Sequence, residues 1–249
     1  MPYLWSTIRV SSDHHGPNEV QFMLEWLNRA AAVRKTLFLG LVNRRRHGYR
    51  WGPLTLEPFH VISASYSFQK LLVSIDCYSF DIEDNEDIVL PNQLLEHLEE
   101  LNLDETSVKL QHDAKLPHLQ SLSITSYYGN FQHYSTAIPW SQIRHLTLSK
   151  SFTPAHLLFS ILKQCPRLEY CKIEDPTDLH TPGPFQNITL PNFQSFELSD
   201  SETDIFGVEC IQRLIIPYPA IVLMECGYIS LFTVHKTVRW YALPTHLDT

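Results

Sequence analysis

Histidine and cysteine are the side chains in this chain best suited to hold a metal ion or to act as nucleophiles. The sequence has 13 His and 5 Cys. No two cysteines are spaced C-x-x-C, and no two histidines lie one helical turn apart beside a third plausible ligand. We therefore expect scattered histidines, cysteines packed in a core, and no metal site.

Two charged runs also invite a chemical interpretation. The acidic stretch at 81–87 lacks the central glycine and the terminal Glu of a calcium-binding EF-hand loop, so it is expected to be a solvated loop. Arg44, Arg45 and Arg46 form a short basic run. A nuclear localisation signal or a phosphate-binding role is the less favoured interpretation of this basic run.

Nucleotide-dependent enzymes carry glycine-rich loops that wrap phosphates, and this chain has only 8 Gly. The sequence contains no G-x-x-x-x-G-K, G-x-G-x-x-G, G-x-S-x-G or H-E-x-x-H motif. We predict no cofactor and no catalytic residue, and an enzyme is the last of the functions considered.

The composition and charge of the chain exclude several other classes of protein. The 249 residues are 44% hydrophobic and 12% aromatic, which indicates a folded chain, and the formal charge is −8. That charge draws the chain neither to nucleic acid nor to anionic lipid. No run of 18 apolar residues is present, and the first residues lack the pattern of a secretory signal. We expect an intracellular protein, cytoplasmic or nuclear, that binds neither nucleic acid nor membranes.

One apolar spacing returns along the chain, and it governs the expected fold. The pattern is apolar-x-x-apolar-x-apolar, with successive copies 30, 21, 24, 25 and 25 residues apart. The copies begin at Phe68, Leu98, Leu119, Ile143, Leu168 and Phe193, with a seventh candidate at Ile211. The four consecutive steps of 21 to 25 residues fall within the leucine-rich-repeat period of about 20 to 29 residues. Unrelated strands of an ordinary α/β domain are the alternative.

Helical patterns lie between the copies. Thr153 is a predicted N-cap with Pro154 at the first helical position, and Cys165 before Pro166 ends that helix. Asn92 is a second predicted N-cap. The predicted fold is an α/β leucine-rich-repeat solenoid, an irregular horseshoe with parallel strands on the concave face and helices and loops on the convex face.

The two ends depart from the repeat. Residues 1–60 predict a strand, a helix capped by Asn18 and a second strand, as an N-terminal cap or half-repeat. Residues 61–216 hold the irregular repeats. Residues 217–249 lose the period, and they are either a C-terminal cap or a wrongly assigned exon end.

Several phrases resemble those of one protein family. Pro2-Tyr3-Leu4-Trp5-Ser6-Thr7-Ile8 and Trp26-Leu27-Asn28-Arg29 resemble the stretch after the F-box in fungal F-box proteins with irregular leucine-rich repeats, and 140–148 and 164–171 resemble their repeat phrases. The F-box itself, which in that family precedes the P-x-L-W phrase, is missing from this sequence. The resemblance implies a substrate-binding repeat region linked to ubiquitin-ligase target recruitment, with a Skp1-type adaptor as partner only if an F-box lies upstream of Met1.

The surface of such a repeat is the candidate site. Residues that alternate with the apolar positions of each strand should form one polar face, suited to binding an unidentified protein target. They are Glu100, Asn102, Asp104, Ser121, Ser123, Thr125, His145, Thr147, Ser149, Tyr170, Lys172, Glu174, Ser195, Glu197 and Ser199. We predict a non-enzymatic protein-recognition domain; a truncated repeat scaffold without a ligase role is the alternative.

Overall fold

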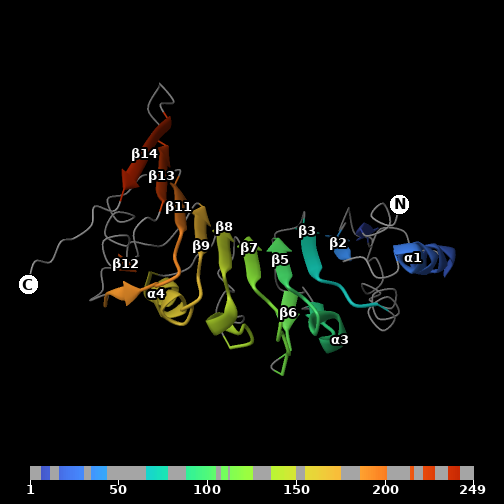
Figure 1. The fold of residues 1–249 in the computed structure, drawn as a ribbon. Helices are drawn as coiled ribbons and strands as arrows, with labels where there is room; N and C mark the ends of the chain where they lie inside the picture. Colours follow the sequence, from blue (N-terminus) through green and yellow to red (C-terminus); the bar gives the residue numbers. More distant parts are fainter. Residues whose placement is uncertain are drawn as a thin grey trace, which may run out of the picture. The chain divides into compact units, whose positions relative to one another are not determined.

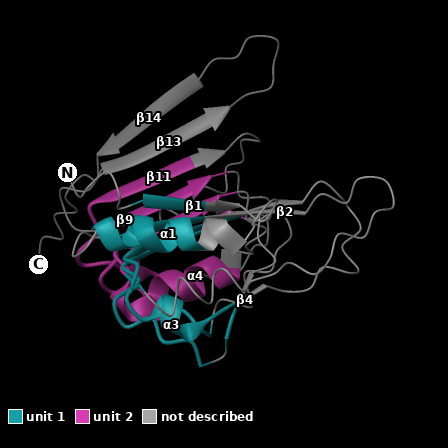
Figure 2. Cartoon of the chain, turned by 90° about the vertical axis from the view of Figure 1, so that its right-hand side faces the viewer, with its two compact units in different colours: residues 1–119, 132–138 teal, residues 120–131, 139–249 magenta. Residues whose placement is uncertain are grey.

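A computed structural model gives the fold of the chain (Figure 1). It describes residues 7–11, 17–30, 35–43, 66–77, 88–104, 108–111, 113–125, 136–149, 155–174, 186–200, 214–215, 221–227 and 235–241. The chain divides into two compact units, coloured separately in Figure 2. Unit 1 comprises residues 1–119 and 132–138, and unit 2 comprises residues 120–131 and 139–249.

Unit 1 contains a parallel sheet built from β1 (Thr7–Ser11), β2 (Thr36–Asn43), β3 (Lys70–Cys77) and β5 (Glu100–Asp104). Each strand pairs in parallel with the next one named. Helix α1 (Pro17–Ala30) connects β1 to β2. The expected order of strand, helix and strand at the N-terminal end is therefore confirmed.

Helix α1 begins at Pro17, so Asn18 is inside the helix and its prediction as the N-cap is wrong. Proline suits the first helical position because the N–H it lacks would have no intrahelical partner there. Leu27 is fully buried, and the hydroxyl of Tyr66 donates to the carbonyl oxygen of Leu24 at 3.0 Å and to Oδ1 of Asn28 at 2.6 Å. These contacts tie α1 to the segment that leads into β3.

A second pair of strands in unit 1 flanks the short helix α3 (Asn92–Leu95). Strands β4 (Ile88–Leu90) and β6 (Val108–Leu110) pair in parallel. The predicted N-cap Asn92 is wrong, because Pro91 occupies that position and Asn92 is the first helical residue. From there its side chain makes no capping bond, and its buried Oδ1 has no hydrogen-bond partner among the described residues.

Unit 2 contains five further parallel strands. They are β7 (Ser121–Thr125), β8 (His145–Ser149), β9 (Tyr170–Glu174), β11 (Ser195–Asp200) and β13 (Ile221–Gly227), joined at the edge by the antiparallel strand β14 (His235–Tyr241). Consecutive strands in that order are hydrogen-bonded neighbours. The protein is therefore an α/β protein with parallel strands, as the sequence predicted.

Two helical segments of unit 2 lie between strands. The 3₁₀ helix η4 (Trp140–Gln142) precedes β8, and α4 (Ala155–Lys163) precedes β9. Helix α4 ends just before Cys165-Pro166, as predicted, whereas the predicted cap Thr153 and Pro154 lie outside the described residues. Within the described part of the chain, no helix has both the length and the apolar character needed to cross a membrane.

The repeated apolar pattern forms the core. All three apolar positions in each of the six copies are buried, from Phe68 in the first copy to Leu198 in the last. In unit 2, Leu122, Leu146 and Cys171 are neighbours in the register, so equivalent side chains of successive copies lie against one another. Burial of these positions is the prediction on which the expected fold depended, and it is confirmed.

A four-residue turn leads into each of five strands and adds a buried position that the sequence analysis missed. In each turn the N–H of the fourth residue donates to the carbonyl of the first over 3.1 to 3.3 Å, and both residues are buried. The turns are Leu95 to Leu98, Leu116 to Leu119, Trp140 to Ile143, Cys165 to Leu168 and Leu190 to Phe193. Proline stands second in three of them, where its fixed φ favours the turn.

One backbone interaction recurs at the residue before each strand. The carbonyl oxygen of Gln120 accepts from the N–H groups of Arg144 and His145 at 2.8 and 3.0 Å. The carbonyl oxygens of Arg144 and Glu169 accept equivalent pairs one repeat later, and that of Gln69 does so in unit 1. The same backbone geometry thus starts successive strands and sets their register.

The seventh candidate copy does not join the main sheet of unit 2. Its Leu214 lies in β12 (Leu214–Ile215), which pairs in parallel with β10 (Ile188–Thr189). Strand β13 takes the place beside β11 instead, although residues 217–249 lack the period. Leu223 of β13 lies opposite Glu197, so this strand continues the sheet without the leucine pattern.

Candidate functional site

The register of unit 2 aligns most of the predicted site residues in three rows that cross the strands. The rows are Ser121, His145, Tyr170 and Ser195; Ser123, Thr147, Lys172 and Glu197; and Thr125, Ser149, Glu174 and Ser199. Because side chains alternate along a strand, the described members project away from the buried leucines. We call these twelve positions the polar face of unit 2.

The other three predicted residues, Glu100, Asn102 and Asp104, lie on β5, which belongs to unit 1. There Nζ of Lys70 on β3 lies 2.5 Å from Oε1 of Glu100. The row of unit 1 that contains Asn102 is less polar than the rows of unit 2, because its other members in the register are Phe38 on β2 and Leu72 on β3. Twelve of the predicted residues thus belong to unit 2 and three belong to unit 1.

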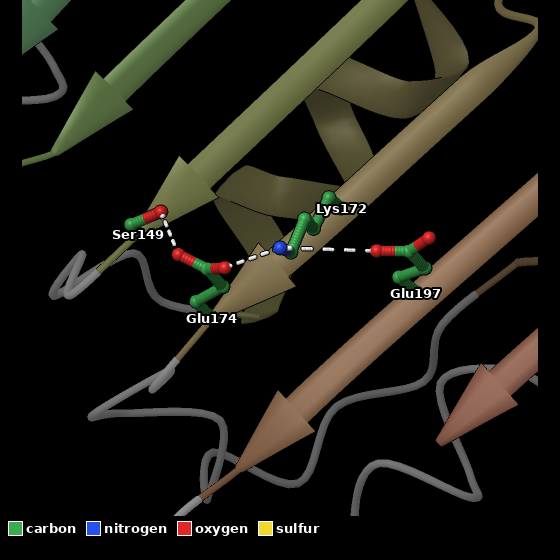
Figure 3. Close-up of polar contacts among 4 residues, drawn as sticks. All are labelled: Ser149, Lys172, Glu174 and Glu197. Atoms are coloured by element: carbon green, nitrogen blue, oxygen red, sulfur yellow. Dashed lines mark hydrogen bonds and ion pairs between the residues drawn. The ribbon is translucent and has the colours of Figure 1, made fainter. Parts of the chain in front are cut away.

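A polar network at the centre of the face joins β8, β9 and β11 (Figure 3). Nζ of Lys172 lies 2.5 Å from Oε1 of Glu174 and 3.8 Å from Oε2 of Glu197. The hydroxyl of Ser149 donates to Oε2 of Glu174 at 2.6 Å. The ammonium group is therefore held mainly by Glu174, and Glu197 is the more distant carboxylate.

Tyr170 extends the network at the start of β9. Its hydroxyl hydrogen-bonds to Glu197, and its ring centroid lies 6.4 Å from that of His145 on β8. Burial, then the hydrogen bond to Glu197 and its charge, raise the pKa of Tyr170 above its ordinary value. The phenol stays protonated near neutral pH, so Tyr170 acts as a hydrogen-bond donor and a contact surface.

Exposure separates the members of the network. Ser149 is buried, whereas the side chains of Lys172, Glu174 and Glu197 are 32%, 35% and 31% exposed. Ion pairs at such partly exposed sites contribute only about 0.2 to 1 kcal/mol each to folding stability. The three charged side chains are within reach of solvent, and a partner could contact them.

Beneath the polar face the sheet packs against α4 (Figure 2). Leu158 and Leu162 of α4 line a small apolar pocket together with Ile173 of β9 and Leu198 of β11. Cys171, between Tyr170 and Lys172, points to this side and is fully buried. The strand β9 therefore has an apolar side facing α4 and a polar side facing away from it.

The histidines, cysteines and carboxylates of the described ranges bear on metal binding and on thiol chemistry. No group of three or more His, Cys, Asp or Glu side chains there is arranged to hold a metal ion. Burial raises the pKa of Cys165 to about 12 and also raises that of Cys171, which keeps both thiols protonated at neutral pH. Protonated, buried thiols are poor nucleophiles.

Pairwise contacts within the face were missed by the sequence analysis, although the sequence contains a signal for them. Lys172 and Glu197 are 25 residues apart, as are Ser149 and Glu174. One repeat period in a parallel, in-register sheet brings equivalent positions side by side. The same spacing predicts the pair of Arg144 and Glu169, whose nearest atoms lie 3.4 Å apart.

Comparison with known proteins adds no family or relative. No protein-family model matches the chain. The search of curated proteins likewise finds no match.

Proposed function

We propose that the chain is a non-enzymatic protein-recognition domain whose polar face in unit 2 contacts a target protein. The observation that carries the proposal is the ordered, partly exposed network of Lys172, Glu174 and Glu197 on a sheet whose other side packs against α4. A hydroxyl-rich surface with a tyrosine near its centre provides many small polar contacts and one large contact residue. Tyrosine is enriched among the residues that dominate protein–protein binding energies.

The finer description of the fold belongs to the same proposal. Six buried copies of the apolar pattern, the repeated turn and the repeated bifurcated carbonyl support a leucine-rich-repeat solenoid with the polar residues on its concave face. The resemblance to fungal F-box proteins then suggests a substrate-binding repeat region linked to ubiquitin-ligase target recruitment. A Skp1-type adaptor would be a partner of a longer chain that carries an F-box.

A photo-crosslinking experiment tests the recognition function. A benzophenone amino acid replaces Thr147, a half-buried residue in the middle row, and in a matched variant it replaces His156, an exposed residue of α4. Both variants are expressed in the cells that produce the protein, irradiated and analysed by mass spectrometry. We expect a protein that crosslinks at position 147 and not at position 156.

Two results would count against the proposal. Equal crosslinking at both positions indicates non-specific contact, and crosslinking at position 156 alone indicates that a different surface binds. An absence of crosslinks at both positions favours the alternative of a repeat scaffold without a target. Co-purification of Skp1 with a longer chain, followed by ubiquitination of the crosslinked protein, tests the ligase role separately.

A further inference from the structure

We propose that the polar face of unit 2 binds a protein segment bearing an arginine, whose guanidinium group pairs with Glu197 beside the ring of Tyr170. This inference rests on the proposed recognition function and adds the chemistry of the partner. It commits to one occupant, a basic side chain on a polypeptide.

The charge balance of the face favours a basic partner. Lys172 is the one cation among its described residues, and it faces two carboxylates, Glu174 and Glu197. The strands β7 and β8 contribute hydroxyl side chains and His145 to the face, with no carboxylate or ammonium group. An excess of negative charge is left on β9 and β11, and a partner's cation complements it.

The distances single out Glu197 as the receiving carboxylate. Lys172 lies at hydrogen-bonding distance from Glu174, but its Nζ is 3.8 Å from Oε2 of Glu197, beyond the range of a direct hydrogen bond. A carboxylate offers about four acceptor positions on two oxygens. A guanidinium group can therefore bond to Glu197 while the short contact between Lys172 and Glu174 remains intact.

The surroundings of Tyr170 agree with an excess of negative charge on this part of the face. The charges of Glu197 and Glu174 both contribute to the raised pKa of the Tyr170 phenol, after the larger contribution of burial. Burial and the hydrogen bond to Glu197 oppose ionisation most, and the charges of the two carboxylates add to this effect. The same carboxylates attract a cation placed beside the ring.

Arginine fits this site better than lysine for two reasons. Its planar guanidinium can donate two parallel hydrogen bonds to one carboxylate, and it stacks on aromatic rings. Tyr170 supplies such a ring directly beside Glu197, and the His145 ring lies 6.4 Å from it at an angle of 47°. An ammonium group would form the ion pair without the stacking contact.

Selection from a random peptide library tests the partner's chemistry. The whole chain is used to select from 12-residue peptides displayed on phage, and the affinities of the selected peptides are measured by calorimetry. We expect a shared arginine in these peptides. Replacement of that arginine by citrulline, which keeps the shape and removes the charge, should weaken binding at least about tenfold.

A double-mutant cycle then locates the contact. Glu197→Gln should weaken binding of the arginine peptide about tenfold, and it should cause little further loss for the citrulline peptide, because both changes remove the same interaction. Tyr170→Leu should weaken binding of both peptides. Glu96→Gln, the same chemical change on an exposed residue of unit 1, should leave both affinities unchanged.

The outcomes separate this inference from the recognition function. Peptides that crosslink to the benzophenone at position 147 but share an acidic or an apolar residue would overturn the arginine proposal and leave recognition standing. Additive effects of Glu197→Gln and citrulline would also overturn it. Peptides that bind without crosslinking at position 147 would count against both.

Discussion

Lys172 separates two carboxylates that belong to neighbouring strands. Glu174 follows it on β9, and Glu197 lies directly opposite on β11. Without the ammonium group, the repulsion between the carboxylates would no longer be offset. The sequence alternation predicted that all three side chains share a face, and the register places Lys172 opposite Glu197.

A methionine at position 172 keeps the length of the side chain and removes its charge. We expect Lys172→Met to lower the free energy of unfolding by about 1 kcal/mol at neutral pH and low salt, in urea denaturation. The loss should shrink in 1 M salt, because salt screens the carboxylates. Lys115→Met, at an exposed position in unit 1, is the control. An equal effect of both substitutions would contradict a special role for Lys172.

The buried thiols provide a second prediction for single residues. Cys165 and Cys171 have no exposed surface, and burial raises the pKa of Cys165 to about 12 from its ordinary 9.0. Iodoacetamide at pH 8 should leave both unmodified in the folded protein and modify both in urea, as read by peptide mass spectrometry. Modification of either thiol at equal rates in the two states would show that the core around it is open.

The raised pKa of Cys165 also predicts how the free energy of unfolding changes with pH. Above pH 9 the unfolded chain releases the Cys165 proton, whereas the folded protein keeps it up to about pH 12. The unfolded state then binds fewer protons, so the free energy of unfolding falls as the pH rises through this window. Cys165→Ala should flatten the fall between pH 9 and 11 in urea denaturation. An unchanged slope would show that Cys165 does not contribute.

At the scale of the elements, the turns before the strands add a buried apolar position that the repeated spacing did not include. Each turn begins with a buried apolar residue three positions before the first residue of the predicted pattern. The full pattern of a repeat is therefore apolar-x-x-apolar-x-x-apolar-x-apolar. Trp140 and Cys165 occupy the first position in two copies, which concealed the regularity behind different residue types.

Leu116 tests the importance of that first position. It is 3% exposed, and Leu116→Ala should lower the free energy of unfolding by about 2 to 5 kcal/mol, as expected for a truncated core leucine. His118→Ala changes an exposed residue of the same turn and should have an effect within about 0.5 kcal/mol. Similar losses in thermal and urea unfolding of the two variants would contradict a core role for the turn.

Predictability from sequence differed between elements for physical reasons. The six buried copies followed from leucine spacing, because each strand buries one side against the core. Strand β13 was missed because Ile221, Val222 and Leu223 form a continuous apolar run without alternation. The predicted caps Asn18 and Asn92 were wrong because α1 begins at Pro17, one residue before Asn18, and α3 begins at Asn92 itself. The local preference of Asn for the N-cap position therefore did not determine where either helix begins.

At the scale of the whole molecule, the hydrogen-bonded neighbours of a strand should determine how far a local defect spreads. In repeat proteins, stability is close to a sum of repeats and their nearest-neighbour interfaces. Leu71 on β3 and Leu146 on β8 are both fully buried, one in each unit. These two positions therefore offer matched perturbations of the two units.

Hydrogen exchange measured by mass spectrometry tests this locality. We expect Leu146→Ala to accelerate exchange in β7, β8 and β9 more than in β13, and Leu71→Ala to accelerate exchange in β2, β3 and β5. Each variant is the control for the other. Uniform acceleration across all peptides in both variants would indicate a single cooperative transition instead.

The in-register pairing also constrains how such a chain can grow by duplication. A copied segment inserted beside its parent would place Lys172 against a second Lys172 and Glu174 against a second Glu174, and like charges directly opposite each other are destabilising. Copied leucines face no such penalty. Selection after duplication would therefore preserve the apolar positions and diversify the charged ones. In this chain Lys172 lies opposite Glu197 and Lys70 lies opposite Glu100, so opposite charges face each other at both positions.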